Sequence, residues 1–288
     1  MTEDLPPLRE VIARHDLGAK KALGQHFLLD LNITRKIARA AEIALGDLVI
    51  EVGPGPGGLT RALLDAGAEV IAIERDRRCI GALEELGAAF QGKLTLIEDD
   101  ALRIDERRIA SGRQAKIVAN LPYNISTELL IKWLKANHRE DPPLWPLMAL
   151  MFQKEVADRI LAAPRTKDYG RLSVIAQAGS IPSRAFDLPA RAFTPPPKVS
   201  SSVVLFRMSA TRIANMRALE AVTQAAFGQR RKMLRSSLKS LFGEGLGDAL
   251  RGAGAAETMR AEELDVDAFR RLATEFDRQS LSGAKSPR

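Results

Sequence analysis

The sequence predicts an α/β fold with a parallel sheet, followed by a small domain made only of helices. Between residues 48 and 152, short apolar strands alternate with amphipathic helices. These strands are apolar along nearly their whole length, which is typical of a parallel sheet covered on both faces. After Met208 the strand pattern stops and helical periodicity continues. We therefore expect one domain over residues 1–209 and a helical domain over residues 210–288.

Apolar periodicity and turn residues place the individual elements along the chain. A short helix is expected at residues 8–14 and a longer one at 32–41, where apolar residues recur at helical spacing. The expected strands are 48–52, 69–74, 94–99, 115–120 and 147–152, with a β pair at 183–188 and 201–207. The expected helices are 58–66, 78–86, 127–134, 154–162 and 171–178, then 212–227, 231–241, 246–250 and 266–276.

A glycine-rich loop after the first long strand is the strongest local signal. The strand ends near Glu51, and four glycines follow within residues 53–58. Glycine permits backbone angles that a side chain forbids, and a helix start offers unpaired N–H groups to a ligand. Gly53, Gly55 and Gly58 formally match a dinucleotide fingerprint, with Glu74 about twenty residues on as a ribose-binding acid. The same geometry serves S-adenosylmethionine, so this loop leaves both cofactors open.

Two features further along the chain favour S-adenosylmethionine over a nicotinamide cofactor. Ligands of parallel sheets bind at the carboxyl ends of the strands, so the loops that follow the strands meet in one crevice. Asp100 follows the third strand, where a carboxylate can accept from the amino group of adenine. Asn120 and the three residues after it follow the fourth strand.

The segment Asn120-Leu121-Pro122-Tyr123 suits methyl transfer to an amino group on a conjugated ring. Such an amine is a poor nucleophile because its lone pair is delocalised, so catalysis needs acceptors aimed at its hydrogens. The Asn120 amide oxygen and the Leu121 main-chain carbonyl are the candidates, and Tyr123 would stack on the base. Alone, these four residues are more often a turn with a packed tyrosine. Their place after the fourth strand favours the functional interpretation.

A base within folded nucleic acid must leave its stack to enter such a pocket, which requires aromatic faces. Phe193, beside the stiff segment Pro195–Pro197, is the candidate for a second face, although a buried core phenylalanine is an equally common use of this residue. The histidines, His15, His26 and His138, lack metal-ligand spacing, so we expect no metal centre.

The net charge of +7 suits a polyanionic partner, and the positions of the basic residues say more than the total. The candidates for RNA contact are Lys20, Lys21, Arg230, Arg231, Arg235 and Lys239. The alternative for the second group is a solvated helix face. The lone Cys79 excludes a disulfide framework and fits a reducing cytoplasm, and no apolar run reaches the length of a membrane span.

Several motifs stand in a fixed order along the chain. They are Leu23-Gly24-Gln25-His26-Phe27-Leu28, Glu51-Val52-Gly53-Pro54-Gly55, Ile73-Glu74, Asp100-Ala101, Asn120-Leu121-Pro122-Tyr123-Asn124-Ile125-Ser126, Gln153-Lys154-Glu155-Val156, Tyr169-Gly170-Arg171-Leu172-Ser173 and Phe193-Thr194-Pro195-Pro196-Pro197-Lys198-Val199. Together they resemble the KsgA/RsmA family, the small-subunit ribosomal RNA adenine N6,N6-dimethyltransferases. The resemblance runs from about Lys20 into the C-terminal helices.

This resemblance implies a Rossmann-like class I S-adenosylmethionine-dependent methyltransferase domain and a small helical domain that contributes to rRNA binding. It implies dimethylation of the N6 atoms of two adjacent adenosines in the 3′-terminal hairpin loop of 16S rRNA, within the small subunit or its precursor, by a cytoplasmic monomer. By motif, cofactor contacts fall on His26, Leu28, Gly53, Gly55, Glu74, Asp100 and Asn120. Roles toward the target base fall on Asn120, Leu121, Tyr123 and Phe193.

Two positions depart from the family pattern, and three other functions stay open. His26 stands where the family often has asparagine. Asp99 stands where glycine often precedes the adenine-binding acid, so the resemblance ranks Asp100 above Asp99. The nearest alternative is the same chemistry on 23S rRNA, as in the macrolide-resistance methylases. A non-catalytic ribosome assembly factor and a nicotinamide-dependent oxidoreductase are the others; the latter would leave the segment 120–123 unexplained.

Overall fold

The structure is a computed structural model that describes residues 5–18, 25–138, 142–209, 213, 215–229 and 231–283. The described residues fall into two compact units, one within 1–157 and 183–207 and the other within 158–182 and 208–288. By their contacts, residues 158–182 therefore belong with the C-terminal helices, whereas a single boundary after residue 209 would join them to the first domain. The division into two independently folding domains, 1–209 and 210–288, stays a prediction.

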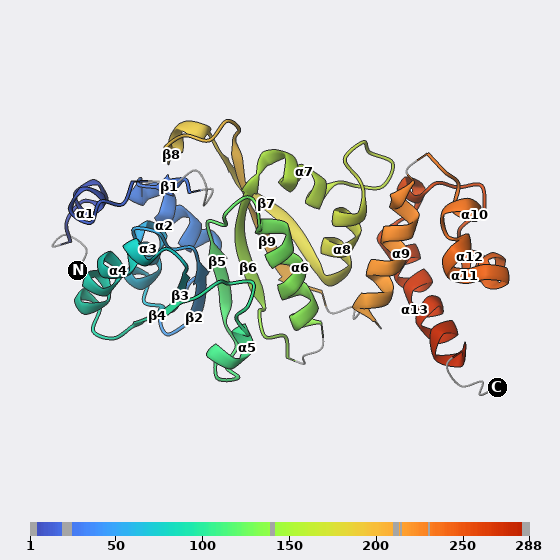
Figure 1. Cartoon of the computed structure of the whole chain (residues 1–288), viewed down its shortest axis with the longest axis horizontal. Coiled ribbons are helices and arrows are strands. Elements are labelled where there is room, and N and C mark those ends of the chain that lie inside the picture. Colours follow the sequence, from blue (N-terminus) through green and yellow to red (C-terminus); the bar gives the residue numbers. More distant parts are fainter. Residues whose placement is uncertain are drawn as a thin grey trace. The chain divides into compact units, whose positions relative to one another are not determined.

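Seven strands form the main sheet of the described residues, in the order β4-β3-β2-β5-β6-β9-β7. The first five of these run parallel, and β9 pairs antiparallel with β6, which confirms the α/β fold class (Figure 1). The strands are β2 Leu48–Val52, β3 Glu69–Glu74, β4 Leu94–Glu98, β5 Lys116–Ala119, β6 Leu147–Gln153, β7 Ser180–Leu188 and β9 Ser201–Met208.

Burial along the strands explains why apolar runs in the sequence predicted them. Every residue of β2 is buried, so both faces of this strand are covered, whereas β4 at the sheet edge is only partly covered. The helices are α1 Leu8–Arg14, α2 Leu31–Ala40, α3 Gly58–Asp65, α4 Arg77–Ala89, α5 Glu106–Ile109, α6 Ser126–Asn137, α7 Lys154–Leu161, α8 Arg171–Gly179, α9 Met216–Gly228, α10 Leu234–Ser237, α11 Lys239–Phe242, α12 Leu246–Ala253 and α13 Val266–Gly283. Short 3₁₀ turns lie at Ala190–Ala192, Gly243–Gly245 and Ala261–Glu263.

Aspartate caps set the starts of three helices. The side chains of Asp30, Asp76 and Asp105 each accept a hydrogen bond from a backbone N–H in the first turn of α2, α4 and α5 respectively. Such a cap satisfies a donor that has no partner within the helix. Helix α5 was not predicted, because four residues are too few to show helical periodicity.

A second, two-stranded sheet was also not predicted. Strand β1 (Phe27–Leu28) pairs antiparallel with β8 (Phe193–Thr194), and Leu28 lies opposite Phe193. Strands of two residues carry no alternating pattern, and the partners stand far apart in the sequence. This pairing joins the segment before α2 to the segment before the proline run.

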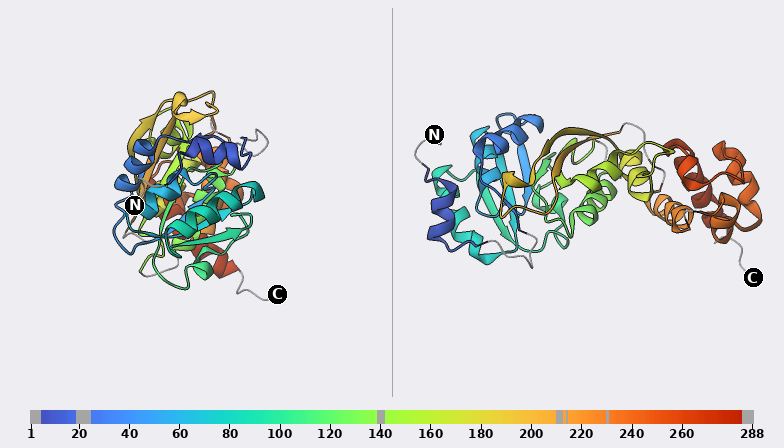
Figure 2. Two further views of the ribbon diagram at one scale, coloured as in Figure 1. Left: turned by 90° about the vertical axis from the view of Figure 1, so that its left-hand side faces the viewer. Right: turned by 90° about the horizontal axis from the view of Figure 1, so that it is seen from above.

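Helix α1 packs against α4, as the right-hand view of Figure 2 shows. Val11 of α1 and Leu17, just after α1, share a buried cluster with Cys79 and Leu83 of α4. Cys79 is 1% exposed, so it is fully buried. Burial raises the pKa of its thiol to about 12, which keeps the sulfur protonated and unreactive.

The C-terminal unit is built around α9 and α13, with α12 packed on α13 (orange and red in Figure 1). The ring of Phe227 stacks on Phe269 at 5.4 Å and meets Tyr169 edge-on at 6.0 Å, so residues from 158–182 share this core. The prediction of one helix over residues 231–241 is wrong. Met233 is extended and bridges to Arg260, which leaves the short helices α10 and α11.

Candidate active site

A large cavity opens at the carboxyl ends of the parallel strands in the first unit. Its volume is about 1200 Å³, counting the space at its opening to solvent. The loops after β2, β3, β4 and β5 all contribute to its lining, which is the arrangement expected for a parallel sheet. The candidate residues that line it are His26, Leu28, Gly53, Gly55, Glu74, Asp100, Asn120, Leu121 and Tyr123.

The loop between β2 and α3 needs glycine for two different reasons. Gly53, Gly55 and Gly57 have φ angles of 69°, 56° and 85°, in the left-handed region that other residues rarely adopt. At Gly58 the reason is space, because a Cβ atom there would lie 2.5 Å from the carbonyl oxygen of Leu28. The loop backbone is therefore exposed to the cavity, and residues 25–28 lie directly on the start of α3.

We expect Gly58→Ala to weaken cofactor binding by about tenfold or more, because the added methyl must displace the Leu28 backbone. Overpacking of this kind costs about 1–3 kcal/mol, and 1.4 kcal/mol corresponds to tenfold in affinity. Calorimetric titration with S-adenosylhomocysteine measures the effect. Gly87→Ala in α4, where the added methyl meets only ordinary contacts with Leu94, is the matched control. Wild-type affinity in the Gly58 variant would contradict the prediction.

Glu74, at the end of β3, is held with both carboxylate oxygens in place. One oxygen accepts the Asp76 N–H at 2.7 Å, and the other accepts the Gly55 N–H at 3.0 Å. Burial raises the pKa of Glu74, and these backbone N–H groups oppose the shift. The side chain is 6% exposed and lines the cavity, so it can accept from a pair of hydroxyl groups on a ligand.

Glu51 is a lining residue that the sequence interpretation passed over. It is 1% exposed, and its Oε2 atom has no hydrogen-bond partner among the described residues. Burial, with the nearby Glu74 carboxylate adding to it, raises the pKa of Glu51 to about 8. An unpartnered carboxyl oxygen at the cavity wall is a place for a cationic ligand group. The one sequence signal was an acid within an otherwise apolar strand.

The loop after β4 distinguishes the two adjacent acids. Asp100 lines the cavity, whereas Asp99 is exposed. The Asp99 carboxylate accepts a hydrogen bond from the Asp100 N–H at 2.6 Å. Asp100 accepts the Leu102 N–H at 3.0 Å and pairs with Arg75 at 3.2 Å. Geometry thus favours Asp100 over Asp99 as the acceptor for a ligand amino group. Arg75, which also lines the cavity, was not predicted.

The loop after β5 presents Asn120 and Tyr123 to the cavity. The Asn120 amide nitrogen donates to the His26 carbonyl at 3.0 Å. Because a carbonyl can only accept, this contact turns the amide oxygen Oδ1 away from His26. The Tyr123 hydroxyl is 2.7 Å from Ser201 Oγ, and burial raises the pKa of Tyr123, so the phenol is neutral near pH 7.

His26 takes up a position that the sequence did not predict, and Phe193 takes the buried core position that was its alternative. The His26 ring stacks on Tyr123 at 5.6 Å between centroids, and its Nδ1 is 2.8 Å from the Pro195 carbonyl. Phe193 is 2% exposed, packs in the core with Leu28 and is absent from the cavity lining. In this arrangement its ring offers no free face to a base, so its stacking role stays a prediction.

None of the three predicted RNA-contact residues that the structure describes lines the cavity. Arg231, Arg235 and Lys239 are exposed in the C-terminal unit. Lys20, Lys21 and Arg230 lie outside the described residues.

Comparison with known proteins identifies the family. A model described as ribosomal RNA adenine dimethylase matches residues 17–278. The chain belongs to the ribosomal RNA adenine dimethylase family. Relatives named ribosomal RNA small subunit methyltransferase A include one from Xanthobacter autotrophicus, 56% identical over 98% of this chain and 97% of its own length. Another, from Azorhizobium caulinodans, is 54% identical over 98% and 96%.

Solved structures of this family and its neighbours share the fold. A dimethyladenosine transferase from Plasmodium falciparum superposes with a TM-score of 0.73 at 26% identity, covering 88% of this chain and 98% of its own. The 23S rRNA methyltransferase ErmE superposes with a TM-score of 0.65 at 25% identity, covering 87% and 99%.

As a ribosomal RNA adenine dimethylase, the chain is an S-adenosylmethionine-dependent enzyme. The cavity fits this cofactor in three respects: backbone exposed by glycine, a fixed carboxylate at Glu74 and an unpartnered carboxyl oxygen at Glu51. Among the described helices of this dimethylase, none is both long and apolar enough to cross a membrane.

Proposed function

We propose that this protein dimethylates the N6 atoms of two adjacent adenosines in the 3′-terminal hairpin loop of 16S rRNA, within the small ribosomal subunit or its precursor. The observation that carries this proposal is the Asn120–Tyr123 loop at the wall of a cavity suited to S-adenosylmethionine. The relatives named small subunit methyltransferase A support the choice of subunit. We further propose that the enzyme is a cytoplasmic monomer that contributes to subunit assembly.

For the cofactor, we assign the glycine loop to the amino-acid end and Glu74 to the ribose hydroxyls. Asp100 is the acceptor for the adenine amino group. The unpartnered oxygen of Glu51, at the wall of the same cavity, accepts from the cofactor's ammonium group. His26, Leu28 and the Asn120 backbone complete the wall. The cofactor supplies an electrophilic methyl group on a sulfonium.

For the target base, the chain supplies acceptors and a stacking face. Asn120 Oδ1 and the Leu121 carbonyl accept hydrogen bonds from the N6 amino group. These bonds draw the nitrogen toward tetrahedral geometry and localise its lone pair. Tyr123 stacks on the ring of the base, and its hydrogen bond to Ser201 fixes the orientation of the phenol. Such preorganised acceptors require no covalent intermediate.

Recognition of rRNA needs basic surface in addition to the base pocket. Arg231, Arg235 and Lys239 are exposed and are proposed to contact phosphates, which makes binding dependent on salt concentration. Lys20, Lys21 and Arg230 share this proposed role. Their neutralisation is expected to weaken rRNA binding while leaving cofactor affinity unchanged.

The decisive experiment combines purified protein, undermethylated small subunits and labelled S-adenosylmethionine. We expect N6,N6-dimethyladenosine in the 3′-terminal hairpin, detected by nuclease digestion and mass spectrometry. The likeness to ErmE makes 23S rRNA the second candidate, so large subunits and naked 23S rRNA are assayed in parallel. Methyl label found on 23S rRNA alone would make 23S rRNA the substrate in place of 16S rRNA. Tight subunit binding without methyl transfer would overturn the catalytic assignment in favour of an assembly factor.

A further inference from the structure

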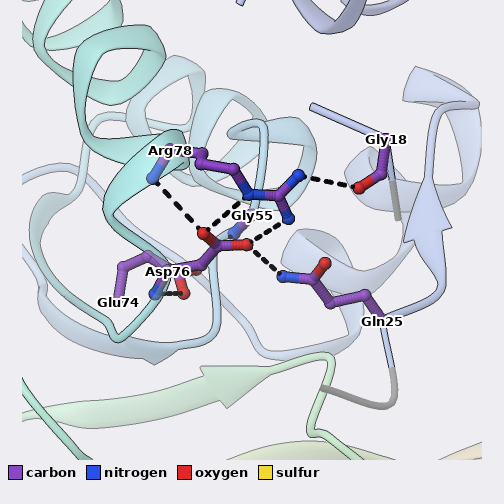
Figure 3. A network of polar contacts seen from close by, with 6 residues as sticks. All are labelled: Gly18, Gln25, Gly55, Glu74, Asp76 and Arg78. Carbon is purple, nitrogen blue, oxygen red and sulfur yellow. Dashed lines mark hydrogen bonds and ion pairs between the residues drawn. The ribbon is translucent and has the colours of Figure 1, made fainter. Parts of the chain in front are cut away.

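One carboxylate beside the cavity, that of Asp76, gathers three separate segments of the chain (Figure 3). Its Oδ2 accepts from Gln25 Nε2 at 3.0 Å and from the Arg78 guanidinium at 2.5 Å. Its Oδ1 accepts the Arg78 Nε at 3.0 Å and caps α4. Arg78 in turn donates to the Gly18 carbonyl at 3.0 Å. Neither Asp76 nor Arg78 belongs to the sites assigned above.

Arg78 is a basic residue in the first turn of a helix, where acidic residues are favoured. It is the second residue of α4, close to the positive end of the helix dipole, where a cation is unfavourable. The Asp76 carboxylate offsets this cost by a two-point ion pair, and Arg78 holds the pKa of Asp76 at about 2. Asp76 is 8% exposed, so its carboxylate is largely shielded from water, whereas the Arg78 side chain is partly exposed.

The segment that this pair grips is one wall of the cavity. Residues 25–28, which we call the strap, all line it. The strap lies tight on the glycine loop, since the Phe27 ring is 3.0 Å from where a Cβ of Gly55 would stand. The Leu28 carbonyl oxygen of the strap is 2.5 Å from where a Cβ of Gly58 would stand. Its placement therefore shapes the space left for the cofactor.

The strap also reaches the proposed catalytic amide. His26, the neighbour of Gln25, accepts from the Asn120 amide nitrogen through its carbonyl, and this contact orients Asn120 Oδ1. On the other side, the Asp76 N–H binds Glu74 Oε1. Hydrogen bonds thus connect Asp76 to the Glu74 carboxylate assigned to the ribose and, through Gln25 and its neighbour His26, to the Asn120 amide assigned to the base.

We propose that Asp76 and Arg78 are positioning residues that hold the strap against the cofactor cavity and, through the His26 carbonyl, orient the Asn120 amide. The effect on the cofactor is independent of the target base. The effect on Asn120 rests on the function proposed above, and the two are measured separately.

The test is Arg78→Gln, with Arg77→Gln as its matched control. Arg77 precedes it in the same turn and forms a solvent-exposed pair with Glu98, so its loss removes equal charge without touching the strap. For Arg78→Gln we expect S-adenosylhomocysteine to bind about tenfold more weakly by calorimetry, since a charged hydrogen bond in a sheltered site is lost. We also expect a several-fold lower kcat at saturating cofactor, and faster amide exchange in the strap.

Two further variants separate positioning from simple destabilisation. Arg78→Lys keeps the charge but not the two-point geometry and should rescue only part of the affinity. Asp76→Asn combined with Arg78→Gln should cost about as much as Arg78→Gln alone, because both act through one pair. Wild-type affinity, kcat and strap exchange in a folded Arg78→Gln would overturn the proposal, as would equal losses in Arg77→Gln. Weaker cofactor binding with unchanged kcat would remove the link to Asn120 and leave the proposed function intact.

Discussion

Replacing Asn120 with alanine is expected to lower kcat for methyl transfer by about 10²–10³-fold. This is the usual loss when one preorganised group that stabilises a transition state is removed. The amide nitrogen is already engaged by the His26 carbonyl, so the oxygen that faces the other way has a fixed direction and no reorganisation to undergo. Alanine removes the acceptor and leaves the N6 lone pair delocalised in the ring.

Single-turnover kinetics with undermethylated small subunits measure this effect apart from binding. Glu128→Ala is the control, because Glu128 lies in the first turn of α6 just after this loop, is exposed and is not part of the cavity lining. It should keep kcat within about threefold of wild type, in line with ordinary surface substitutions. Equal rates for the two variants would show that Asn120 makes no contribution to the chemical step.

Replacing Glu51 with glutamine is expected to stabilise the protein at alkaline pH and to weaken cofactor binding. In the folded protein the pKa of Glu51 is about 8, against an ordinary value of 4.5, so the folded state holds a proton that the unfolded state releases. Stability therefore falls as pH rises from about 4.5 to about 8, by up to about 1.4 kcal/mol per pH unit. Glutamine is neutral throughout and removes this loss.

Thermal unfolding at pH 5 and pH 8, without cofactor, checks the sign. Wild type and Glu51→Gln should differ little at pH 5, and the variant should unfold several degrees higher at pH 8. Calorimetry should show weaker S-adenosylmethionine binding by the variant, because an amide cannot pair with an ammonium as a carboxylate does. A variant less stable than wild type at pH 8 would show that the buried carboxyl is ionised and paired.

The parallel sheet and most of the cavity could be predicted from the sequence. Strands buried on both faces are continuous apolar runs, and parallel pairing brings their carboxyl ends to one edge. Gly53, Asp100 and Asn120 each follow such a run and Glu74 ends one, so their meeting in one cavity was expected from parallel pairing. The family motifs then told which cofactor the cavity holds.

Contacts between distant, short segments could not be predicted. The β1–β8 pairing joins residues about 170 positions apart and gives Phe193 a buried place that no local pattern announces. The break between α10 and α11 has the same origin, since it depends on the bridge from Met233 to Arg260. Periodicity reports which face of an element is buried, and it carries no information about what covers that face.

The sequence by itself thus determined the parallel strands, the loops that follow them and the chemistry of the residues at the strand ends, because these depend on hydrophobic period and on residue type. Only the tertiary structure decided how those groups are aimed. The orphaned oxygen of Glu51, the turned amide of Asn120 and the grip of Asp76 on the strap all depend on partners brought together by folding. Hydrogen bonds are directional and short, so their pattern exists only once the chain has closed around the cavity.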